Sequence, residues 1–397
     1  MKLYNVCDYV TERIDSQFLT TYNYISTENM LPNKEGITYA NNIPKGNVIA
    51  YNKGDILISN IRPYFKKIWQ ANINGGCSSD VLCIRAKSTV SSKFLFYLLS
   101  QQSFFDYVMS GSKGCKMPRG DKQQIMQWDI ELPTLEEQIT IANILSSLDD
   151  KIELNRRINE NLEQQAQALF KSWFVDFEPF KDGKFVDSEL GMIPEGWKVG
   201  TLDEVGEIIG GGTPSKSEPL FYCDKGISWI TPKDLSINQS KYISKGKIDI
   251  TEIGYKNSSA KKIPAGSVLF SSRAPIGYIA IASNEVTTNQ GFKSVIPQKA
   301  GTCFIYLFLK YNTEYIESQA TGSTFKEVSG SLMKSQKLII PTQYILDEFE
   351  YKLGPIFSMQ YNLESENHRL IQIRDTLLPK LMSGELKLSE IETKLDE

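Results

Sequence analysis

The chain has 397 residues, of which 41% are hydrophobic and 23% are charged, and its formal net charge is −3. This length and composition predict two globular domains with connecting helices. No apolar run approaches the roughly 18 residues that span a bilayer, and Asp8 and Glu12 lie where a secretory signal would be, so the sequence predicts a cytoplasmic protein without a membrane partner. Six cysteines without a CxxC pair and a single histidine, His368, argue against a metal site.

The net charge conceals a division of the chain into basic and acidic segments. Residues 1–130 hold 15 Lys+Arg and 10 Asp+Glu, a net charge of +5, and residues 131–190 hold 6 and 13, a net charge of −7. Residues 191–337 hold 17 and 13, a net charge of +4, and residues 338–397 hold 6 and 11, a net charge of −5. This alternation predicts two domains that face phosphates, joined by helices that face something else.

The two basic segments are copies of one another, about 210 residues apart. In each copy a strand-like start, at residues 3–6 and 202–205, precedes a glycine-led hydrophobic strand with a basic turn. That strand is KGDILISNIRPYF at residues 53–65 and AGSVLFSSRAPIGY at residues 265–278. A small-residue loop, an apolar strand and a long amphipathic helix follow in both. A chain duplicated in this way can present two similar reading surfaces, which suits a DNA duplex.

The loops of both copies contain the candidate DNA contacts, because cations hold phosphates or guanine edges and short polar side chains reach bases. In the first copy the candidates are Arg62, Lys66, Lys67, Ser112, Lys113, Lys116 and Arg119. In the second copy they are Ser215, Lys216, Arg273, Ser323, Thr324 and Lys326. For each of them, an exposed side chain without a role in binding is the alternative. Tyr64, Phe65 and Trp69 are expected to pack in the core or on a sheet rather than stack on bases.

The first acidic segment has the pattern of a long helix with a partner. A capping box, Thr134 followed by Glu137, predicts where the helix starts. A heptad seam follows, made of Ile141, Leu145, Leu148, Ile152, Asn155, Asn159, Leu162, Ala166, Leu169 and Trp173. A shift of 208 residues gives a second seam, with Leu353, Ile356, Leu363, Asn367, Leu370, Leu377 and Leu381. We expect the two helices to pair with each other, with the asparagines fixing register.

Both helices contain a feature that predicts an irregularity. Pro355 should break or restart the second helix, because it lacks the N–H that would bond to Tyr351, and the first helix is expected to bend at the matching Ser146 and Ser147. Beyond these points about 27 helical residues remain, or roughly 40 Å, slightly more than the 34 Å or so of one B-DNA turn. Such a pair could hold two reading domains at a fixed separation; an ordinary structural hairpin is the alternative.

Several runs of this sequence resemble the specificity subunits of type I restriction-modification systems. LPTLEEQITIANILSSLDDKIELNRRINENLEQQAQALFKSWFVDFEPF, at residues 132–180, resembles their central conserved region, and IPEGWKVGTLDEVGEIIGGGTPS, at residues 193–215, resembles the start of a target recognition domain. TNQGFKSVIP at residues 288–297 and LLPKLMSGEL at residues 377–386 resemble further characteristic stretches. The resemblance covers nearly the whole chain. The first domain departs from it, because MKLYNVCDYV lacks a proline-glycine-tryptophan lead and a GGGTPS-like loop.

The resemblance implies an α+β (mixed α/β) fold with a pseudo-two-fold repeat. Two target recognition domains, residues 1–132 and 181–340, would be separated by two long conserved helical regions, residues 133–180 and 341–397, that form an antiparallel coiled coil. Each domain would read one half of a bipartite target in double-stranded DNA, and the helices would set the spacing and dock two methyltransferase subunits. Restriction (motor-nuclease) subunits can join such a complex. S-adenosylmethionine would bind the methyltransferase partners, and no cofactor is expected on this chain.

The residues themselves also indicate that catalysis lies elsewhere. An adenine methyltransferase needs a polar-proline-proline-aromatic motif, whereas DFEPF at residues 176–180 lacks the double proline. GGGTP at residues 210–214 lacks the GK[ST] of a Walker loop, and we interpret it as a tight turn. Two alternatives remain: a recognition subunit of another methyltransferase or nuclease assembly, and a coiled-coil adaptor that does not bind DNA. A DNA affinity that falls steeply with salt would exclude the adaptor.

Overall fold

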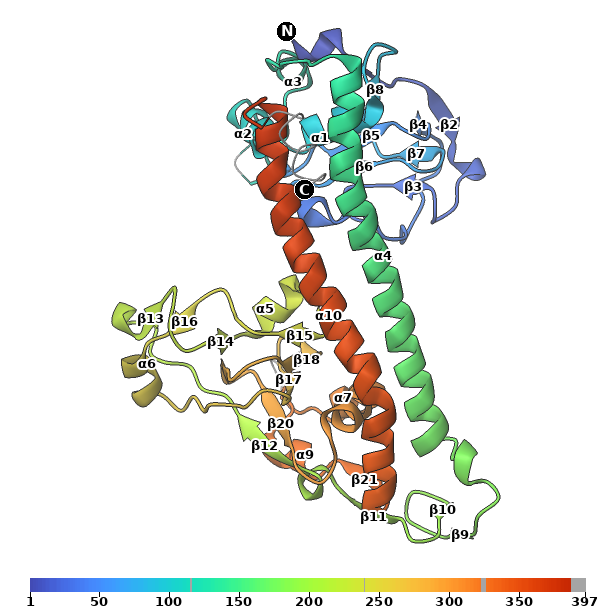
Figure 1. Ribbon diagram of the computed structural model, residues 1–397, viewed down its shortest axis with the longest axis vertical. Helices are drawn as coiled ribbons and strands as arrows, with labels where there is room; N and C mark the ends of the chain where they lie inside the picture. Colours follow the sequence, from blue (N-terminus) through green and yellow to red (C-terminus); the bar gives the residue numbers. More distant parts are fainter. Residues whose placement is uncertain (115, 239, 323–325, 387–397) are drawn as a thin grey trace, which may run out of the picture. The chain divides into compact units, whose positions relative to one another are not determined.

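The computed structural model describes residues 1–114, 116–238, 240–322 and 326–386 (Figure 1). The chain forms two compact units, Met1–Glu153 with Arg369–Glu397, and Leu154–His368. Two long helices, α4 (Leu135–Phe174) and α10 (Gln343–Met382), contribute residues to both units. No helix in the described part of the chain is long and apolar enough to cross a membrane. The boundary between the two units falls within each of these helices.

The first unit contains two four-stranded sheets. The antiparallel sheet has the order β1 (Cys7–Tyr9), β8 (Val81–Ala86), β5 (Ile56–Ser59) and β6 (Ile68–Gln70). The mixed sheet has the order β2 (Arg13–Asp15), β4 (Asn47–Tyr51), β7 (Gly75–Cys77) and β3 (Tyr24–Ile25). The helical elements are η1 (Leu3–Asn5), η2 (Ser16–Phe18), η3 (Pro32–Lys34), η4 (Pro63–Phe65), α1 (Ser92–Leu99), α2 (Gln102–Ser110) and α3 (Lys122–Met126).

The second unit is built on one five-stranded sheet with smaller strand pairs. Its order is β12 (Gly206–Gly210), β20 (Lys293–Pro297), β17 (Val268–Ser272), β18 (Ile276–Ala282) and β15 (Tyr242–Ile243). The pairs are β9 (Phe185–Val186) with β10 (Ile193–Pro194), β11 (Lys198–Thr201) with β21 (Lys337–Ile340), β13 (Tyr222–Cys223) with β16 (Asp249–Ile250), and β14 (Trp229–Ile230) with β19 (Thr287–Thr288). The helical elements are η5 (Glu178–Phe180), η6 (Leu202–Glu204), η7 (Pro219–Phe221), α5 (Pro232–Ile237), α6 (Glu252–Lys256), α7 (Thr302–Tyr311), α8 (Thr313–Ser318) and α9 (Gly330–Lys334).

The two units repeat one topology. The order β1-β8-β5-β6 in the first unit matches β12-β20-β17-β18 in the second. A parallel strand contact also recurs at the equivalent place, β3 with β7 in the first unit and β14 with β19 in the second, and the second unit adds a parallel contact of β15 with β18. Helix α1 follows β8 along the chain as α7 follows β20. The duplication read from the sequence is thus a duplication of structure.

The central strand of each repeated sheet is buried on both faces. In β5, Ile56 and Ile58 pack into the same core as helix α1, whereas Leu57 faces a second core. Strand β17 has the same alternation, with Val268 in the core of α7 and Leu269 in the other. Successive side chains of a strand point to opposite faces, and apolar runs such as ILIS and VLFSS are typical of strands covered on both sides.

Helix α4 begins at Leu135, as the capping box predicts. The backbone N–H of Thr134 donates to Glu137 Oε2 at 2.9 Å, and the N–H of Glu137 donates to Thr134 Oγ1 at 3.4 Å. The helix then continues for 40 residues. Along it, the hydroxyl groups of Ser146 and Ser147 donate to carbonyls three residues earlier, at 3.3 and 2.8 Å.

Helix α10 also continues for 40 residues, so the predicted break at Pro355 is wrong. A proline inside a helix removes one hydrogen bond and costs about 3 kcal/mol. Packing on both sides of the proline offsets that cost. Phe349 and Leu353 before it and Phe357 after it are buried in one hydrophobic core.

Within each unit the two helices run antiparallel. In the first unit, Arg374 of α10 donates to Asp149 of α4 at 2.7 Å, and Ile141 and Leu381 share one core. In the second, Asn155 of α4 donates to Asn367 of α10, and further along Gln360 donates to Glu163. The residue numbers of the contacting partners thus fall along α10 as they rise along α4.

The seam residues lie on the covered faces of α4 and α10. Those that are buried are Ile141, Leu145, Ile152, Asn155, Ala166, Trp173, Leu353, Leu363 and Leu381. Those that are half-buried are Leu148, Asn159, Leu162, Leu169, Ile356, Asn367, Leu370 and Leu377. Near the helix ends the seam is part of a domain core: Ile141 packs with α1 residues and Trp173 with α7 residues. The ends of the long helices therefore form part of the hydrophobic cores of the two units.

Candidate nucleic-acid interface

The glycine run that ends strand β12 is held by close backbone contacts. A Cβ on Gly211 would lie 2.0 Å from the carbonyl oxygen of Asn289, and a Cβ on Gly212 would lie 2.2 Å from the backbone nitrogen of Ala260. Neither glycine has a positive φ, so glycine is needed here for space rather than for a left-handed turn. The carbonyl of Gly212 also accepts a hydrogen bond from Trp229 Nε1 at 3.0 Å. The loop that follows therefore starts from a fixed position.

The turn after β19 lies against this loop. The Asn289 side chain accepts from the N–H of Gly291 at 2.9 Å, and the Gln290 side-chain oxygen accepts from the Thr213 hydroxyl. The backbone N–H of Gly212 donates to the Thr288 carbonyl at 2.9 Å. The two stretches GGGTPS and TNQG, separated by about 75 residues in the sequence, thus form one surface.

A cavity of about 600 Å³ opens where these two loops meet the basic turn of the second copy. Its walls combine cations, amides and aromatic rings. The lining residues are Thr213, Lys216, Tyr222, Trp229, Thr231, Pro232, Lys233, Ile248, Arg273, Ala274, Asn289, Gln290 and Gly291. Lysine and arginine bind phosphate or guanine edges, and asparagine and glutamine amides match adenine edges. The chemistry of the walls suits DNA.

Arg273 and Lys216, two of the predicted contacts, line this cavity together. Arg273 forms an ion pair with Glu327 at 3.5 Å, and Lys293 approaches the same carboxylate at 3.2 Å. Ser215 is exposed and shares a hydrogen bond with Ser217 at 2.7 Å. Lys326 is exposed beside Glu327. The predicted residues Ser323 and Thr324 lie outside the described residues.

The first unit brings its basic turn and its small-residue loop together in the same way. Arg62 has a φ of 50° and its backbone N–H donates to the Pro118 carbonyl at 2.8 Å. Lys113 and Arg119 exchange two backbone hydrogen bonds of 3.0 Å across the loop. In the second unit the matching bridge joins Thr321 to Glu327. Both copies therefore have an arginine turn and a backbone bridge between two residues six apart in the sequence.

The predicted cations of the first unit differ in whether they pair with a carboxylate. Lys116 is exposed, Lys113 pairs with Asp121 at 3.0 Å, and Arg119 pairs with Asp80 at 3.2 Å. Exposed pairs of this kind hold their charges weakly. The side chains of Lys113 and Arg119 are 83% and 57% exposed, so both cations can exchange a carboxylate for a phosphate.

Three further predicted contacts of the first unit are partly engaged in the fold. Lys67 donates to the Thr27 carbonyl at 2.7 Å, and burial lowers its pKa. The Ser112 hydroxyl donates to the Met109 carbonyl at 2.8 Å, which closes the end of α2. Lys66 is half-buried, with a φ of 50°. These side chains shape the turn and the loop, and they are weaker candidates for direct contact than Lys116 and Arg119.

Two aromatic residues beside Arg62 are exposed, contrary to the expectation that they pack inside. Tyr64 is 48% exposed and Phe65 is 39% exposed, with ring centroids 4.7 Å apart. Trp69 does pack on the sheet, edge-on against Tyr51. The 3₁₀ turn η4 explains the difference, because it takes the chain off the sheet directly after β5. Exposed rings beside a cation are typical of surfaces that stack on bases.

The structure adds residues that the sequence did not single out as contacts. Lys233, Asn289 and Gln290 line the cavity although they follow short strands that pair only with each other. The run TNQGFKSVIP carries a family signal, but nothing in its local pattern places it beside the GGGTPS loop. The antiparallel pairing of β12 with β20 and the hydrogen bond from Gly212 to Thr288 bring the two runs together.

A repeated pair of basic, loop-built surfaces on mixed α+β domains, combined with long paired helices, defines a DNA-recognition protein. Comparisons with known proteins specify which one. The family model for the type I restriction modification DNA specificity domain matches residues 1–164 and 194–351. The chain belongs to this family, the specificity subunits of type I restriction-modification systems, and its role is DNA sequence specificity.

Individual relatives agree with this assignment. The HindI specificity subunit of Haemophilus influenzae is 30% identical over 95% of this chain and 97% of its own length. The MjaIX specificity subunit of Methanocaldococcus jannaschii is 42% identical over 44% of this chain and 40% of its own length. The crystal structure of a type I restriction-modification S subunit from M. genitalium covers 96% of this chain and 95% of its own, with a TM-score of 0.59 and 15% identity, and it supports the fold.

Proposed function

We propose that each recognition domain reads one half of a bipartite target in double-stranded DNA and that this chain supplies the specificity of a methylating complex in the cytoplasm. The methyl transfer itself belongs to two methyltransferase subunits that bind S-adenosylmethionine, so this chain is not an enzyme. Restriction subunits can join the same complex and cleave unmethylated DNA. Family membership supports the recognition role, and it favours this role over that of a coiled-coil adaptor without DNA affinity.

One observation carries the division into two half-sites. The same architectural parts, an arginine turn and a bridged pair of residues, meet in each unit. Arg62 contacts Pro118 beside the bridge of Lys113 with Arg119, and Arg273 contacts Glu327 of the bridge with Thr321. Their side chains are not the same, however, since Arg119 of the first loop corresponds to Glu327 of the second. Two domains that share a backbone arrangement but carry different side chains can read two different DNA sequences.

The helices are proposed as the element that sets the spacing. Helices α4 and α10 each continue without a break through residues of both units, and 40 helical residues rise about 60 Å. A continuous helix has a constant rise and rotation per residue. Its length thus determines where a domain at either end meets the DNA groove.

The exposed side of α4 is proposed as a docking surface for methyltransferase. Leu154 and Ile158, one helical turn apart, are 52% and 38% exposed. Helix α4 also holds seven Asp+Glu and four Lys+Arg, a net charge of −3. Apolar side chains exposed one turn apart on an acidic helix suit a partner that contributes a basic surface with an apolar groove.

The test is to map methylated bases by single-molecule sequencing in cells that express the methyltransferase with this chain, and in cells that lack the chain. A split motif, two short half-sites with a fixed gap, should appear only when the chain is present. Methylation without a motif, or the same motif in both strains, would overturn the proposal. Purified complex should also lose DNA affinity steeply as salt rises, because phosphate contacts release counterions.

A further inference from the structure

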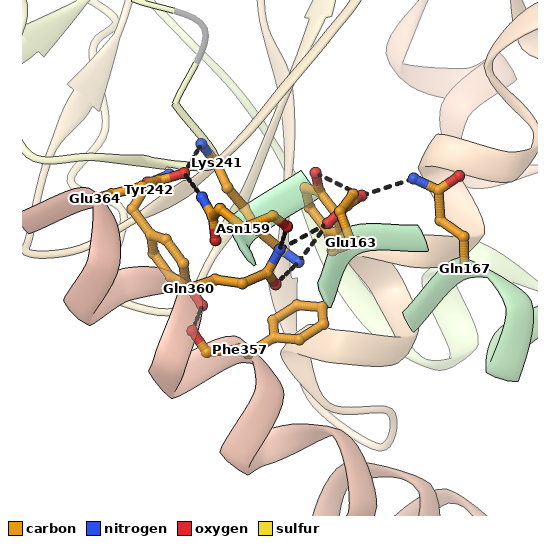
Figure 2. Close-up of polar contacts among 9 residues, drawn as sticks. Asn159, Glu163, Gln167, Lys241, Tyr242, Phe357, Gln360 and Glu364 are labelled. Carbon is orange, nitrogen blue, oxygen red and sulfur yellow. Dashed lines mark hydrogen bonds and ion pairs between the residues drawn. The ribbon is translucent and has the colours of Figure 1, made fainter. Parts of the chain in front are cut away.

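A lysine of the second recognition domain lies buried between the two long helices. Lys241 directly precedes β15, the edge strand of the five-stranded sheet, and its side chain is 5% exposed. Figure 2 shows that the side chain extends to α4 and α10. Its Nζ lies 2.9 Å from Glu163 of α4 and donates to Gln360 of α10 at 2.7 Å. One amine thus binds both helices.

Aromatic rings complete the surroundings of this amine. The Nζ lies 3.3 Å from the ring centroid of Phe357 and 4.3 Å from that of Tyr306. The Tyr306 hydroxyl, from α7, donates to Glu163 at 3.4 Å. A cation held over aromatic faces and against a carboxylate has a narrow range of favourable positions.

The backbone beside the lysine is tied to the same helices. The N–H groups of Lys241 and Tyr242 donate to the carboxylate of Glu364 at 2.8 and 3.0 Å (Figure 2). Asn159 of α4 donates to Glu364 at 3.2 Å. On its other side, the Lys241 carbonyl accepts from the N–H of Ile281 in β18 at 2.7 Å. This segment connects the sheet to both helices.

These contacts can form in only one register of α4 against α10. Glu163 of α4 and Gln360 of α10 meet at the same atom, and a slip of one helix by a single turn would move its group by about 5.4 Å. Neither the ion pair nor the hydrogen bond survives such a displacement. Buried ion pairs are weak evidence for stability, and a role in fixing register is among their best supported uses.

The first recognition domain has a comparable arrangement. Lys34 ends η3, which follows β3 as α5 follows β14, and its Nζ approaches Asp375 of α10 at 3.4 Å. Arg374 beside it binds Asp149 of α4, which also accepts from the hydroxyl of Tyr97 in α1 at 2.7 Å. In both domains, the segment that follows the equivalent strand, β3 or β14, thus carries a lysine that contacts a long helix.

We propose that Lys241 is a positioning residue: it holds the second recognition domain in a single register on α4 and α10, and thereby keeps one gap length between the half-sites. The statement about the gap rests on the proposed function. Holding the domain in register does not, and it can be measured on the protein without DNA.

The test uses three variants of the full chain in its complex. Lys241→Met with Glu163→Gln removes both charges at nearly constant volume, so neither partner is left buried and unpaired. Glu364→Gln is a second, milder change, because its carboxamide has one acceptor oxygen for two backbone N–H groups. Lys262→Met is the matched control, since Lys262 forms an exposed pair with Glu285 inside the recognition domain.

Hydrogen exchange at the amides of residues 241 and 242 should quicken roughly tenfold or more in both test variants and should not change in the control. In Glu364→Gln these amides lose their charged acceptor, and in the double variant the segment that carries them loses the anchor of the lysine side chain. Methylation mapping should return both half-sites unchanged but with more than one gap length. Unchanged exchange together with a single gap would overturn the proposal. A purely structural lysine would lower the midpoint of unfolding without widening the range of gaps. If the unaltered complex produced no split motif, the proposed function would fail, while the exchange experiment would still decide the role of Lys241.

Discussion

Asn155 of α4 and Asn367 of α10 meet inside the helix pair, where the Asn155 amide nitrogen donates to the Asn367 side-chain oxygen at 2.9 Å. Asn155 is fully buried and also donates to Glu366 at 2.7 Å. An asparagine in an apolar seam costs stability, but it restricts the helices to the register in which it finds its partner. The sequence placed both asparagines in the seam, and the structure shows which pairs with which.

Replacing both residues, Asn155→Leu with Asn367→Leu, should raise the free energy of unfolding and loosen the register. The gain should be about 1 kcal/mol, since an apolar pair replaces a buried polar one. Urea unfolding measures the first effect and methylation mapping the second, as additional gap lengths. Ser146→Leu, at a half-buried position of α4 in the first unit, serves as a control for added apolar surface. A more stable variant with one unchanged gap would show that the asparagines do not set register.

The glycine run offers a prediction with a control one residue away. Gly211→Ala should displace the GGGTPS loop, because its Cβ would meet the Asn289 carbonyl at 2.0 Å. Overpacking of this kind costs roughly 1–3 kcal/mol. Recognition of one half-site should weaken while the other half-site remains. Gly210→Ala should be silent, since no atom lies within 4 Å of its Cβ; equal effects of both variants would contradict the account.

Lys216 should contribute affinity without selectivity. It is exposed and lines the cavity of the second unit. Lys216→Ala should weaken binding to all DNA sequences alike and reduce the slope of log affinity against log salt by about 1. Fluorescence anisotropy over a salt series measures this slope. A change in preferred bases, with an unaltered slope, would assign Lys216 to base reading instead.

Charges on the exposed side of α4 should separate the methyltransferase from this chain. Leu154→Asp with Ile158→Asp should abolish co-purification of the methyltransferase and leave the helical content unchanged, because both side chains already face solvent. Gln164→Asp adds the same type of charge at an exposed polar position of α4 and should have no effect. Retention of the methyltransferase by the double variant would place the docking surface elsewhere.

Because Lys241 is buried, we predict that its contribution to the free energy of unfolding rises with pH. Burial lowers the Lys241 pKa to about 8, against the attraction of Glu163, whereas in the unfolded chain the amine keeps a pKa near 10.4. Between these values the unfolded state binds more protons, so the free energy of unfolding increases with pH across this window and is independent of this group below pH 8 or so.

The tyrosine and cysteine side chains around Lys241 act in the opposite direction. Burial raises the pKa values of Tyr306, Tyr242 and Cys303, so the unfolded chain loses these protons first and their contribution to stability falls as pH rises. That contribution is common to the unaltered chain and to Lys241→Met, and it cancels when the two are compared. Burial raises the pKa of Glu364, and although burial opposes ionisation of Glu163, the ion pair lowers its pKa. Urea unfolding at about pH 7.5 and about pH 9.5 measures how the free energy of unfolding changes with pH. That change should be more positive in the unaltered chain than in Lys241→Met. Equal changes would contradict the assignment.

The sequence predicted those parts of the structure that depend on local pattern. The capping box at Thr134 and Glu137 is a contact between residues three apart, and the buried stripe of α4 follows from its heptad spacing. The strand order of the two units could be anticipated as a repeat, because each apolar run and each basic turn recurs at nearly the same interval.

What the sequence missed depends on distant contacts. Lys241 lies in the polar run SINQSKYISKGK, where nothing distinguishes it from an exposed lysine, and only the approach of α4 and α10 buries it. Tyr64 and Phe65 look like core residues beside β5 until η4 turns them outward. Pro355 was predicted to end a helix because local rules omit the core that packs on both sides of it.

The most direct measurement of the central claim is methylation mapping with two matched variants, Arg62→Ala and Arg273→Ala. The two arginines begin the equivalent turns of the two units. The account predicts that each variant relaxes or loses one half-site, a different half-site for each, while the other half-site and the gap length are retained. If either variant altered both half-sites, or if both altered the same one, the division of reading between two domains would be contradicted.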